Sequence, residues 1–178
     1  FFQHVFVTNI LCTSLNGFAR RSAEMPPRDV AAWVNGLFRQ LTDLVQRFDG
    51  VPVKYVGDGF LCFFSGVHHA DRALEAALRA KTVTQNPNLV IALHSGEIFL
   101  GSIGHPDYAR PDIMGNTVNT AFLVNGWVAA HAPAGVGLTE AAAQLLEQRP
   151  ALKKHEKVTI TGLPAPVALY EPAPEKTV

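Results

Sequence analysis

The chain lacks the features that mark several large classes of protein. Its two cysteines among 178 residues are too few for a disulfide framework, so we expect Cys12 and Cys62 to be buried free thiols in a reducing compartment. Fifteen basic residues balance fifteen acidic ones, which argues against a nucleic-acid partner held by bulk charge. No apolar run approaches the roughly 20 residues of a membrane span, so we expect no membrane segment in this chain.

The composition that remains is typical of one globular domain. Hydrophobic residues make up 48% of the chain, enough for a full core, and no internal repeat or linker divides it. The opening residues Phe1-Phe2-Gln3-His4 are neither a natural initiation site nor a signal peptide, so we expect a piece cut from a longer protein. We predict a single domain over residues 1–178 that is cytoplasmic, alone or within a larger, even membrane-tethered, signalling protein.

The hydrophobic pattern predicts alternating strands and helices. From Arg28 to Phe48 apolar positions recur at a spacing of three and four, which indicates an amphipathic helix. Strands are expected at His4–Leu11, Val51–Val56, Phe60–Phe64, Leu89–His94, Glu97–Ile103, Val158–Thr161 and Val167–Tyr170, with a hairpin around Ser95-Gly96. Further helices are expected at Ala70–Thr84, Asn116–His131 and Thr139–Glu147, the last capped by Thr139, and loops at Phe18–Pro27 and Gly104–Pro111. This order predicts an α+β fold, a ferredoxin-like antiparallel sheet with helices packed on one face and a C-terminal α-β-β extension.

Two short segments place polar side chains beside apolar runs. In residues 54–60, Lys-Tyr-Val-Gly-Asp-Gly-Phe, a Gly-Asp-Gly turn joins two predicted strands as a tight hairpin. The carboxylate of Asp58 stands at the tip of that hairpin. In residues 112–119, Asp-Ile-Met-Gly-Asn-Thr-Val-Asn, an acid and two amides surround the start of a helix. Such a helix start is a usual place for phosphate or ribose contacts.

Together, in this order and at this separation, the two segments resemble the catalytic core of the class III adenylyl/guanylyl cyclases. The resemblance extends to Ser95-Gly96-Glu97 and Thr161-Gly162-Leu163-Pro164, and covers residues 5–172. It implies one cyclase homology domain with a palm-like sheet. It also implies that a nucleoside triphosphate is converted to a 3′,5′-cyclic nucleotide and pyrophosphate. In that family two Mg²⁺ or Mn²⁺ ions assist attack of the ribose 3′-oxygen, at sites shared between the two chains of a head-to-tail dimer.

The resemblance assigns metal binding to two aspartates, of which this chain has one. Asp58 matches the second metal aspartate, and a hairpin tip presents its carboxylate well to a hard cation. Asn9, in Thr8-Asn9-Ile10, is expected at the position of the first aspartate, with the backbone of Ile10 as a further ligand. Because asparagine keeps a carbonyl oxygen but loses the charge, we expect weakened binding of the ions.

Four further positions follow from the resemblance. Lys54 and Asp112 match the base-selecting pair, and a lysine with an aspartate suits the adenine edge, which implies ATP as the substrate. Asn119 matches the asparagine that serves the transition state. The arginine expected one helical turn later is replaced by Leu123, which can neither carry charge nor donate a hydrogen bond. Such arginines are worth roughly 10³–10⁵ in rate, so we expect low or no activity from a homodimer.

A rescuing cation is not evident from the spacing. Arg20, Arg21 and Arg110 lie in predicted loops near the expected site, but their positions in the sequence do not indicate that any of them reaches it.

Several functions therefore stay open. The first is a slow, ATP-preferring nucleotidyl cyclase, and the second is a catalytically inactive pseudo-cyclase that dimerises or senses nucleotide. The third is one half of a heterodimer whose partner supplies missing groups. A diguanylate cyclase is less consistent with the turn, since Gly57-Asp58-Gly59 has one acid where that family has two. An RNA-recognition sheet is disfavoured by the neutral charge and by the lack of paired aromatic strand motifs.

Overall fold

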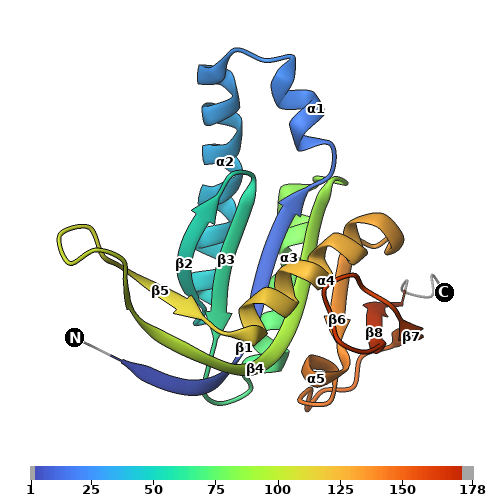
Figure 1. Ribbon diagram of the computed structural model, residues 1–178. Coiled ribbons are helices and arrows are strands. Elements are labelled where there is room, and N and C mark those ends of the chain that lie inside the picture. The colour runs from blue at the N-terminus through green and yellow to red at the C-terminus, as the bar shows by residue number, and fades with distance from the viewer. Residues whose placement is uncertain (1–2, 174–178) are drawn as a thin grey trace.

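An eight-stranded sheet forms the centre of the computed structural model, which describes residues 3–173 (Figure 1). The strands are β1 (His4–Leu15), β2 (Val51–Val56), β3 (Gly59–Phe64), β4 (Leu89–Ile103), β5 (Arg110–Met114), β6 (Val136–Thr139), β7 (Leu152–Val158) and β8 (Val167–Pro172). The helices are α1 (Phe18–Ala23), α2 (Pro27–Arg47), α3 (His69–Thr84), α4 (Asn116–His131) and α5 (Glu140–Ala143). Within the described range, no helix is both long enough and apolar enough to cross a bilayer.

The first half of the sheet has the predicted ferredoxin-like arrangement. Strands β2, β3, β1 and β4 lie side by side in that order, all antiparallel, and α2 and α3 connect them as two βαβ units. The extension adds β6 parallel to β4, followed by β8 and β7. Strand β5 folds back on the outer part of β4 and forms with it a long arm (Figure 1). The α+β prediction is therefore confirmed.

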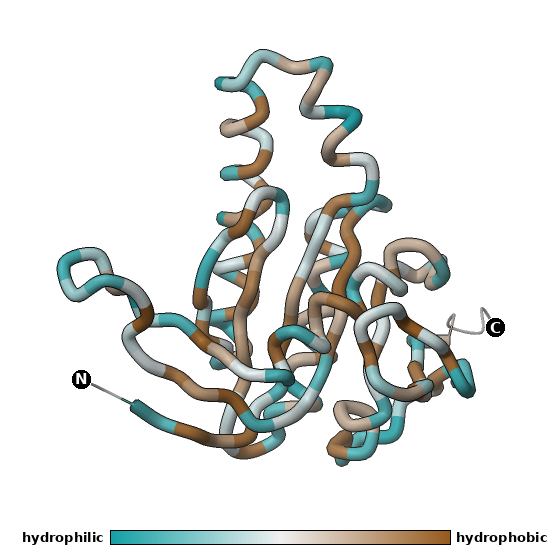
Figure 2. The backbone as a smooth tube through the Cα atoms, in the orientation of Figure 1, coloured by the Kyte–Doolittle hydropathy of each residue, from teal (hydrophilic) through white to brown (hydrophobic). Residues whose placement is uncertain are grey.

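Helices cover both faces of the sheet, so the prediction that they pack on one face was wrong for α4. Helices α2 and α3 pack on one face, where Leu11 and Phe64 point. Helix α4 packs on the other face, against Ile10 and Cys12. Since successive side chains of a strand point to opposite faces, the apolar run in β1 is buried on both sides. Figure 2 shows brown and beige segments along the central strands, interrupted by white and teal.

Strand β4 is continuous, and the hairpin expected around Ser95-Gly96 is wrong. All residues of β4 from Leu89 to Leu100 pair with β1, including Ser95 and Gly96. The long partner strand supplies hydrogen bonds on both sides of the glycine, so the chain has no reason to turn there. The actual hairpin joins β4 to β5, within the segment expected to be a loop.

Two other segments differ from the prediction because their secondary structure depends on contacts with other parts of the chain. The expected loop Phe18–Pro27 contains the short helix α1, which packs on α2 through Phe18 stacked on Trp33 at 5.7 Å between ring centroids. The first closing strand is β7, earlier than the expected Val158–Thr161. Its polar sequence Leu-Lys-Lys-His-Glu-Lys-Val lacks a strand-like pattern, but it pairs with β8 as a charged edge strand.

Thr139 caps α5 as predicted and also ties it to the sheet. Its hydroxyl oxygen accepts a hydrogen bond from the backbone N–H of Ala142 and lies 2.7 Å from Nδ1 of His94 on β4. Burial lowers the pKa of His94 from 6.5 to about 4, so the imidazole is neutral at pH 7. The cysteines are free and buried as expected, and burial raises the pKa of the Cys12 thiol to about 12.

We predict that His94 makes the fold sensitive to mild acid. The unfolded chain binds a proton at His94 below about pH 6.5, whereas the folded chain does so only near pH 4, so stability is lost as pH falls through that window. Between pH 7 and 4.5, the unfolding free energy should fall by about 1–2 kcal/mol more in the native chain than in His94→Asn, after allowance for partial exposure. Urea denaturation at both pH values measures this, and equal pH slopes in the two proteins would contradict it.

Candidate functional site

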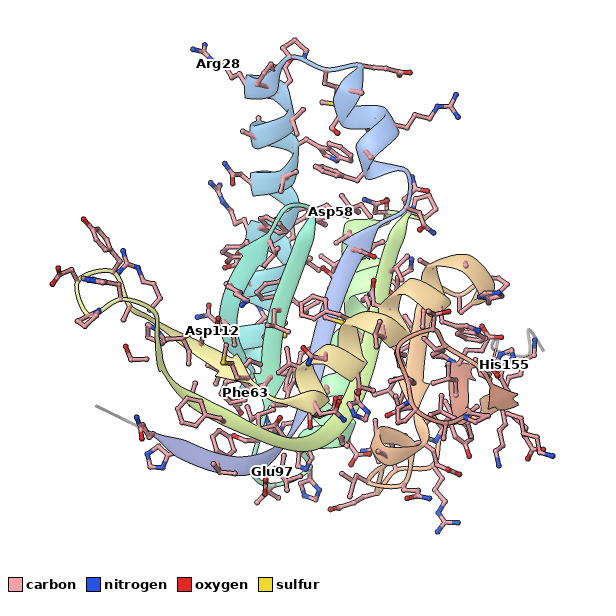
Figure 3. All side chains as sticks on the ribbon, viewed as in Figure 1. Arg28, Asp58, Phe63, Glu97, Asp112 and His155 are labelled. Atoms are coloured by element: carbon pink, nitrogen blue, oxygen red, sulfur yellow. The ribbon has the colours of Figure 1, made fainter. Side chains whose placement is uncertain are left out.

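Asp58 stands at the tip of the β2–β3 hairpin, as the Gly-Asp-Gly turn predicts. Gly57 adopts a positive φ of 58°, which lets the chain reverse without a side-chain clash. The Oδ2 atom of Asp58 accepts a hydrogen bond from the backbone N–H of Leu15 at 2.7 Å. Figure 3 shows Asp58 at the end of the hairpin, beside the point where β1 leads into α1. The carboxylate is therefore fixed against the last residue of β1.

Asn9, predicted as the degenerate first metal position, does not lie beside Asp58. Its Cα pairs with Phe64 at the far end of β3, about 17 Å along the strand from the hairpin tip at roughly 3.3 Å per residue. Its side chain is fully buried, and neither amide atom has a hydrogen-bond partner among the described residues. Asn9 is therefore a buried core residue. The prediction fails because β1 continues to Leu15 instead of ending near Leu11.

The backbone of Ile10 is equally far from the hairpin tip. Ile10 pairs with Phe63 on one side and His94 on the other, so it lies within the sheet and is fully buried. The β1 backbone that reaches Asp58 belongs to Leu15. The nearest β1 position with a polar side chain directed out of the strand is Ser14, which the sequence analysis missed. The signal that could have found it is the pair Gly17-Phe18, where a left-handed glycine ends the strand segment.

Helix α4 holds the side chain of Ser14 by a hydrogen bond. Its hydroxyl donates to Oδ1 of Asn125 at 2.6 Å, and Nδ2 of Asn125 donates to the carbonyl oxygen of Cys12 at 3.2 Å. Asn125 is buried, 7% exposed. We call the Ser14–Asn125–Cys12 set the β1–α4 latch. It satisfies both ends of the buried amide and fixes the end of β1 to the middle of α4.

The residues beside Asp58 do not fit a pair of divalent ions. Mg²⁺ is held in proteins mainly by carboxylate oxygens. In the described hairpin turn and the end of β1, Asp58 is the one acid, and one of its oxygens already accepts from Leu15. The Ser14 hydroxyl is neutral and its proton is directed to Asn125. Two cations beside a triphosphate would have one compensating carboxylate instead of two. The donor set therefore lacks one of the two carboxylates that the resemblance implies for the ion pair.

A histidine and two acids also cluster elsewhere, but not near Asp58. The ligand atoms of His68, Asp71 and Glu147 lie within 4.8 Å of one another, on the surface. The segment with His68 follows the end of β3 remote from the hairpin tip. Both oxygens of Asp71 accept backbone hydrogen bonds from residues 147 and 148, and His68 pairs with Glu147 at 2.6 Å. Through these contacts the cluster connects α3 and the residue before it to the segment after α5.

Lys54 and Asp112 meet as predicted. The Nζ atom of Lys54 on β2 lies 2.7 Å from Oδ2 of Asp112 on β5, and the other Asp112 oxygen accepts from the N–H of Ile113 at 2.8 Å. The Asp112 side chain is 18% exposed and that of Lys54 is 40% exposed, so both are half-buried yet reachable. The pair joins two strands that are not neighbours in the sheet. It presents a donor and an acceptor side by side, as recognition of a base edge requires.

Helix α4 carries Asn119 exposed and Leu123 partly buried. The helix starts against β4, where the Thr117 hydroxyl donates to the carbonyl of Glu97 at 2.6 Å. Leu123 packs on the α4-side core, and its Cδ1 is 3.1 Å from where a Cβ at Gly162 would lie. The position at which the resemblance implies an arginine is thus filled by an apolar side chain packed on the β7–β8 loop.

Three arginines were considered as substitutes for the arginine missing at Leu123. Two of them make other contacts within the chain. The guanidinium of Arg21 lies 4.2 Å from the Trp33 ring centre, a cation–π contact. Arg110 donates to carbonyl oxygens of its own loop, on Tyr108 and Ala109. Arg20 is exposed on α1.

The acid of the hairpin tip and the base-selecting pair lie apart within one chain. Figure 3 shows Asp58 at the end of the hairpin beside α1, and Asp112 farther along the sheet towards the β4–β5 arm. Lys54 precedes Asp58 by most of a strand. One chain therefore presents two separate groups of functional side chains, as the resemblance implies for a site shared between chains.

Comparison with known proteins identifies the family. A family model described as the adenylate and guanylate cyclase catalytic domain matches residues 3–170. The chain belongs to this family. The class III cyclase domain also agrees in fold with solved structures. The adenylyl cyclase CyaB from P. aeruginosa superimposes with a TM-score of 0.84 over 96% of this chain and 95% of that one, at 17% identity. The guanylyl cyclase Cya2 does so with 0.83 over 94% and 91%, at 19% identity.

Curated relatives include both cyclase types. A receptor-type guanylate cyclase of Drosophila melanogaster is 28% identical over 65% of this chain, and an adenylate cyclase of Anabaena cylindrica is 23% identical over 66%. The matched regions span 8% and 26% of those proteins, so this cyclase domain corresponds to a small part of each relative.

We predict that the β1–α4 latch stabilises the fold. In Asn125→Ala, the Ser14 hydroxyl and the Cys12 carbonyl lose their buried partner, which should lower the unfolding free energy by about 2 kcal/mol. The matched control is Asn119→Ala on the same helix, which should change it by less than about 0.5 kcal/mol because Asn119 is exposed. Urea unfolding measures both, and equal effects of the two substitutions would show that the latch has no stabilising role.

Proposed function

We propose that this cyclase domain binds adenine nucleotides and has little cyclase activity of its own. The single observation that carries the proposal is the ion pair of Lys54 and Asp112 at 2.7 Å, a base-selecting pair that is complete and reachable. In contrast, each of the two half-sites of the chain lacks one of the charged groups proposed for catalysis. The domain would thus act mainly through nucleotide-dependent association, which passes a signal to the rest of a longer protein.

The preference for adenine follows from the donor and acceptor that the pair offers. The Lys54 ammonium donates only, so it suits a ring nitrogen of adenine that accepts. The Asp112 carboxylate accepts only, so it suits the exocyclic amine of adenine. Guanine presents a carbonyl oxygen where adenine has that amine, and a carboxylate facing it would leave two acceptors opposed. Such a mismatch leaves a buried polar group unpaired, which is costly.

Impaired chemistry follows from Ser14 and Leu123. The proposed metal site has Asp58 as its one carboxylate, because the β1 residue beside it is Ser14 and not the aspartate that two ions need. Leu123 supplies no charge for a transferring phosphoryl group. When bound, a divalent ion would lower the charge of the triphosphate, and here Asp58 and the Leu15 backbone are the groups that would hold it. Losses at the two positions need not add, since such groups act as a unit.

A second cyclase domain would join the two groups of residues in one site. Figure 3 shows Asp58 and Asp112 apart in one chain, which is consistent with a nucleotide bound between chains, as the resemblance implies. We propose either a homodimer or a heterodimer with another cyclase domain.

The base preference predicts selective nucleotide binding. Wild-type chain should bind ATP more tightly than GTP, and Asp112→Ala should weaken ATP binding about tenfold and abolish the preference. The matched control, Asp107→Ala, removes an exposed acid from the β4–β5 loop and should change neither. Calorimetric titration with each nucleotide measures this. Equal affinity of the wild-type chain for ATP and GTP would rule out the assigned role of the pair.

Restoring charged side chains at positions 14 and 123 should increase cyclase activity. The isolated chain should form cyclic AMP from ATP and Mn²⁺ barely above background, and Ser14→Asp with Leu123→Arg should raise the rate at least about 100-fold. The control pair Ser14→Asn with Leu123→Gln is polar but uncharged, so it should give no gain. Brisk cyclic AMP production by the unmodified chain would overturn the proposal of impaired chemistry.

A further inference from the structure

An open-sided cavity of about 270 Å³ lies beside α4. Residues of β4, α4, the β6–α5 junction and the segment around the start of β8 line it. Its polar lining comes from His94, Thr120, Thr139 and Glu140. Its apolar lining includes Val124 and Leu163. A few polar groups thus accompany a larger apolar lining, which is the usual composition of a small-molecule site.

His94 offers one ring nitrogen to this cavity. The Thr139 oxygen accepts from the N–H of Ala142 and lies 2.7 Å from Nδ1 of His94. We assign the Thr139 proton to this contact with Nδ1, which leaves the proton of the neutral ring on Nε2. The second ring nitrogen is therefore a hydrogen-bond donor, held in position by the capping threonine of α5.

Thr120 is a second polar group without a use in the fold. It is 8% exposed, and no described residue hydrogen-bonds its hydroxyl, which is not among the sealed buried oxygens and so reaches the cavity. The hydroxyl is therefore available to pair with an occupant of the cavity. Glu140, partly buried at the same cavity, adds an acceptor.

We propose that this cavity binds a small neutral molecule that combines a carbonyl oxygen with an apolar ring, such as an aromatic amide. The carbonyl accepts from Nε2 of His94, an amide N–H donates to Glu140, and Thr120 pairs with either group. The ring packs on Val124 and Leu163. Anions are disfavoured, because the lining residues include an acid and no lysine or arginine.

The cavity is placed to affect the cyclase face. Thr120 and Val124 follow Asn119 and Leu123 directly on α4, so the helix face that lines the cavity adjoins the face that carries the cyclase positions. Leu163 of the cavity belongs to the same β7–β8 loop as Gly162, on which Leu123 packs. An occupant would therefore contact both elements that hold the Leu123 side chain. This makes the cavity a regulatory site that is separate from the base-selecting pair.

Benzamide is the probe that tests the site. In ¹⁵N-labelled chain without nucleotide, benzamide should cause saturable shifts of the amide resonances of His94, Thr120 and Leu163. Benzoate, which is an anion of the same shape, and toluene, which lacks the carbonyl, should bind at least about tenfold more weakly. No saturable shift up to the solubility limit of benzamide, or equal binding of toluene, would overturn the proposal.

Two variants separate this site from unspecific contact. Thr120→Val keeps the shape but removes the hydroxyl, and should weaken benzamide binding about five- to tenfold. Ala168→Phe fills the cavity and should abolish the shifts. If the bulky variant does not fold, the isosteric Thr120→Val decides alone, and unchanged benzamide affinity in it would refute the site. Because no nucleotide is present, failure here leaves the proposed ATP binding unaffected.

Discussion

The position of β1 at the centre of the sheet is the constraint on which the rest of the structure depends. It pairs with β4 over all of its 12 residues and, on the other side, with β3 from Asn9 to Thr13. Its side chains enter the two cores alternately, so a shift of one residue would exchange every contact between the faces. This register decides that Leu15 meets Asp58 and that Ser14 meets Asn125. A buried strand paired on both sides thereby sets the geometry of a site at its end.

Much of the fold could be predicted because its signals are local. The periodicity of α2, the Gly-Asp-Gly turn and the bounds of α4 appear directly in neighbouring residues. The continuous strand β4 could not be predicted in this way, since β1, which is distant in sequence, supplies the hydrogen bonds that keep Gly96 extended. The packing of α4 on the second face has the same origin. An apolar run that reads as one strand does not reveal how many of its faces are covered.

The candidate site shows the same division between local and distant information. Asp58, Lys54 and Asp112 lie at turns or strand positions with clear local patterns, and the structure brings the last two together. The partner of Asp58 depended on where β1 ends. An apolar run ending at Leu11 suggested Asn9, whereas pairing with β3 and β4 extends the strand to Leu15. The predicted position is therefore wrong by five residues, Asn9 instead of Ser14. Both side chains are polar and uncharged, so the expected lack of a carboxylate at this position is unchanged.

The placement of the two depleted positions bears on the partner that this domain needs. Ser14 belongs to the hairpin-tip group and Leu123 to the α4 group, and in the proposed head-to-tail dimer these groups would serve different sites. Under the proposed function, a homodimer would combine both losses in each site. A partner domain with intact groups would leave one loss per site, and the complete Lys54–Asp112 pair would still select the base in one of them. The β1–α4 latch also holds Ser14 in a folded role. Under the proposed function, nucleotide binding and association would use groups that the chain has, whereas turnover would need the two charged groups that it lacks.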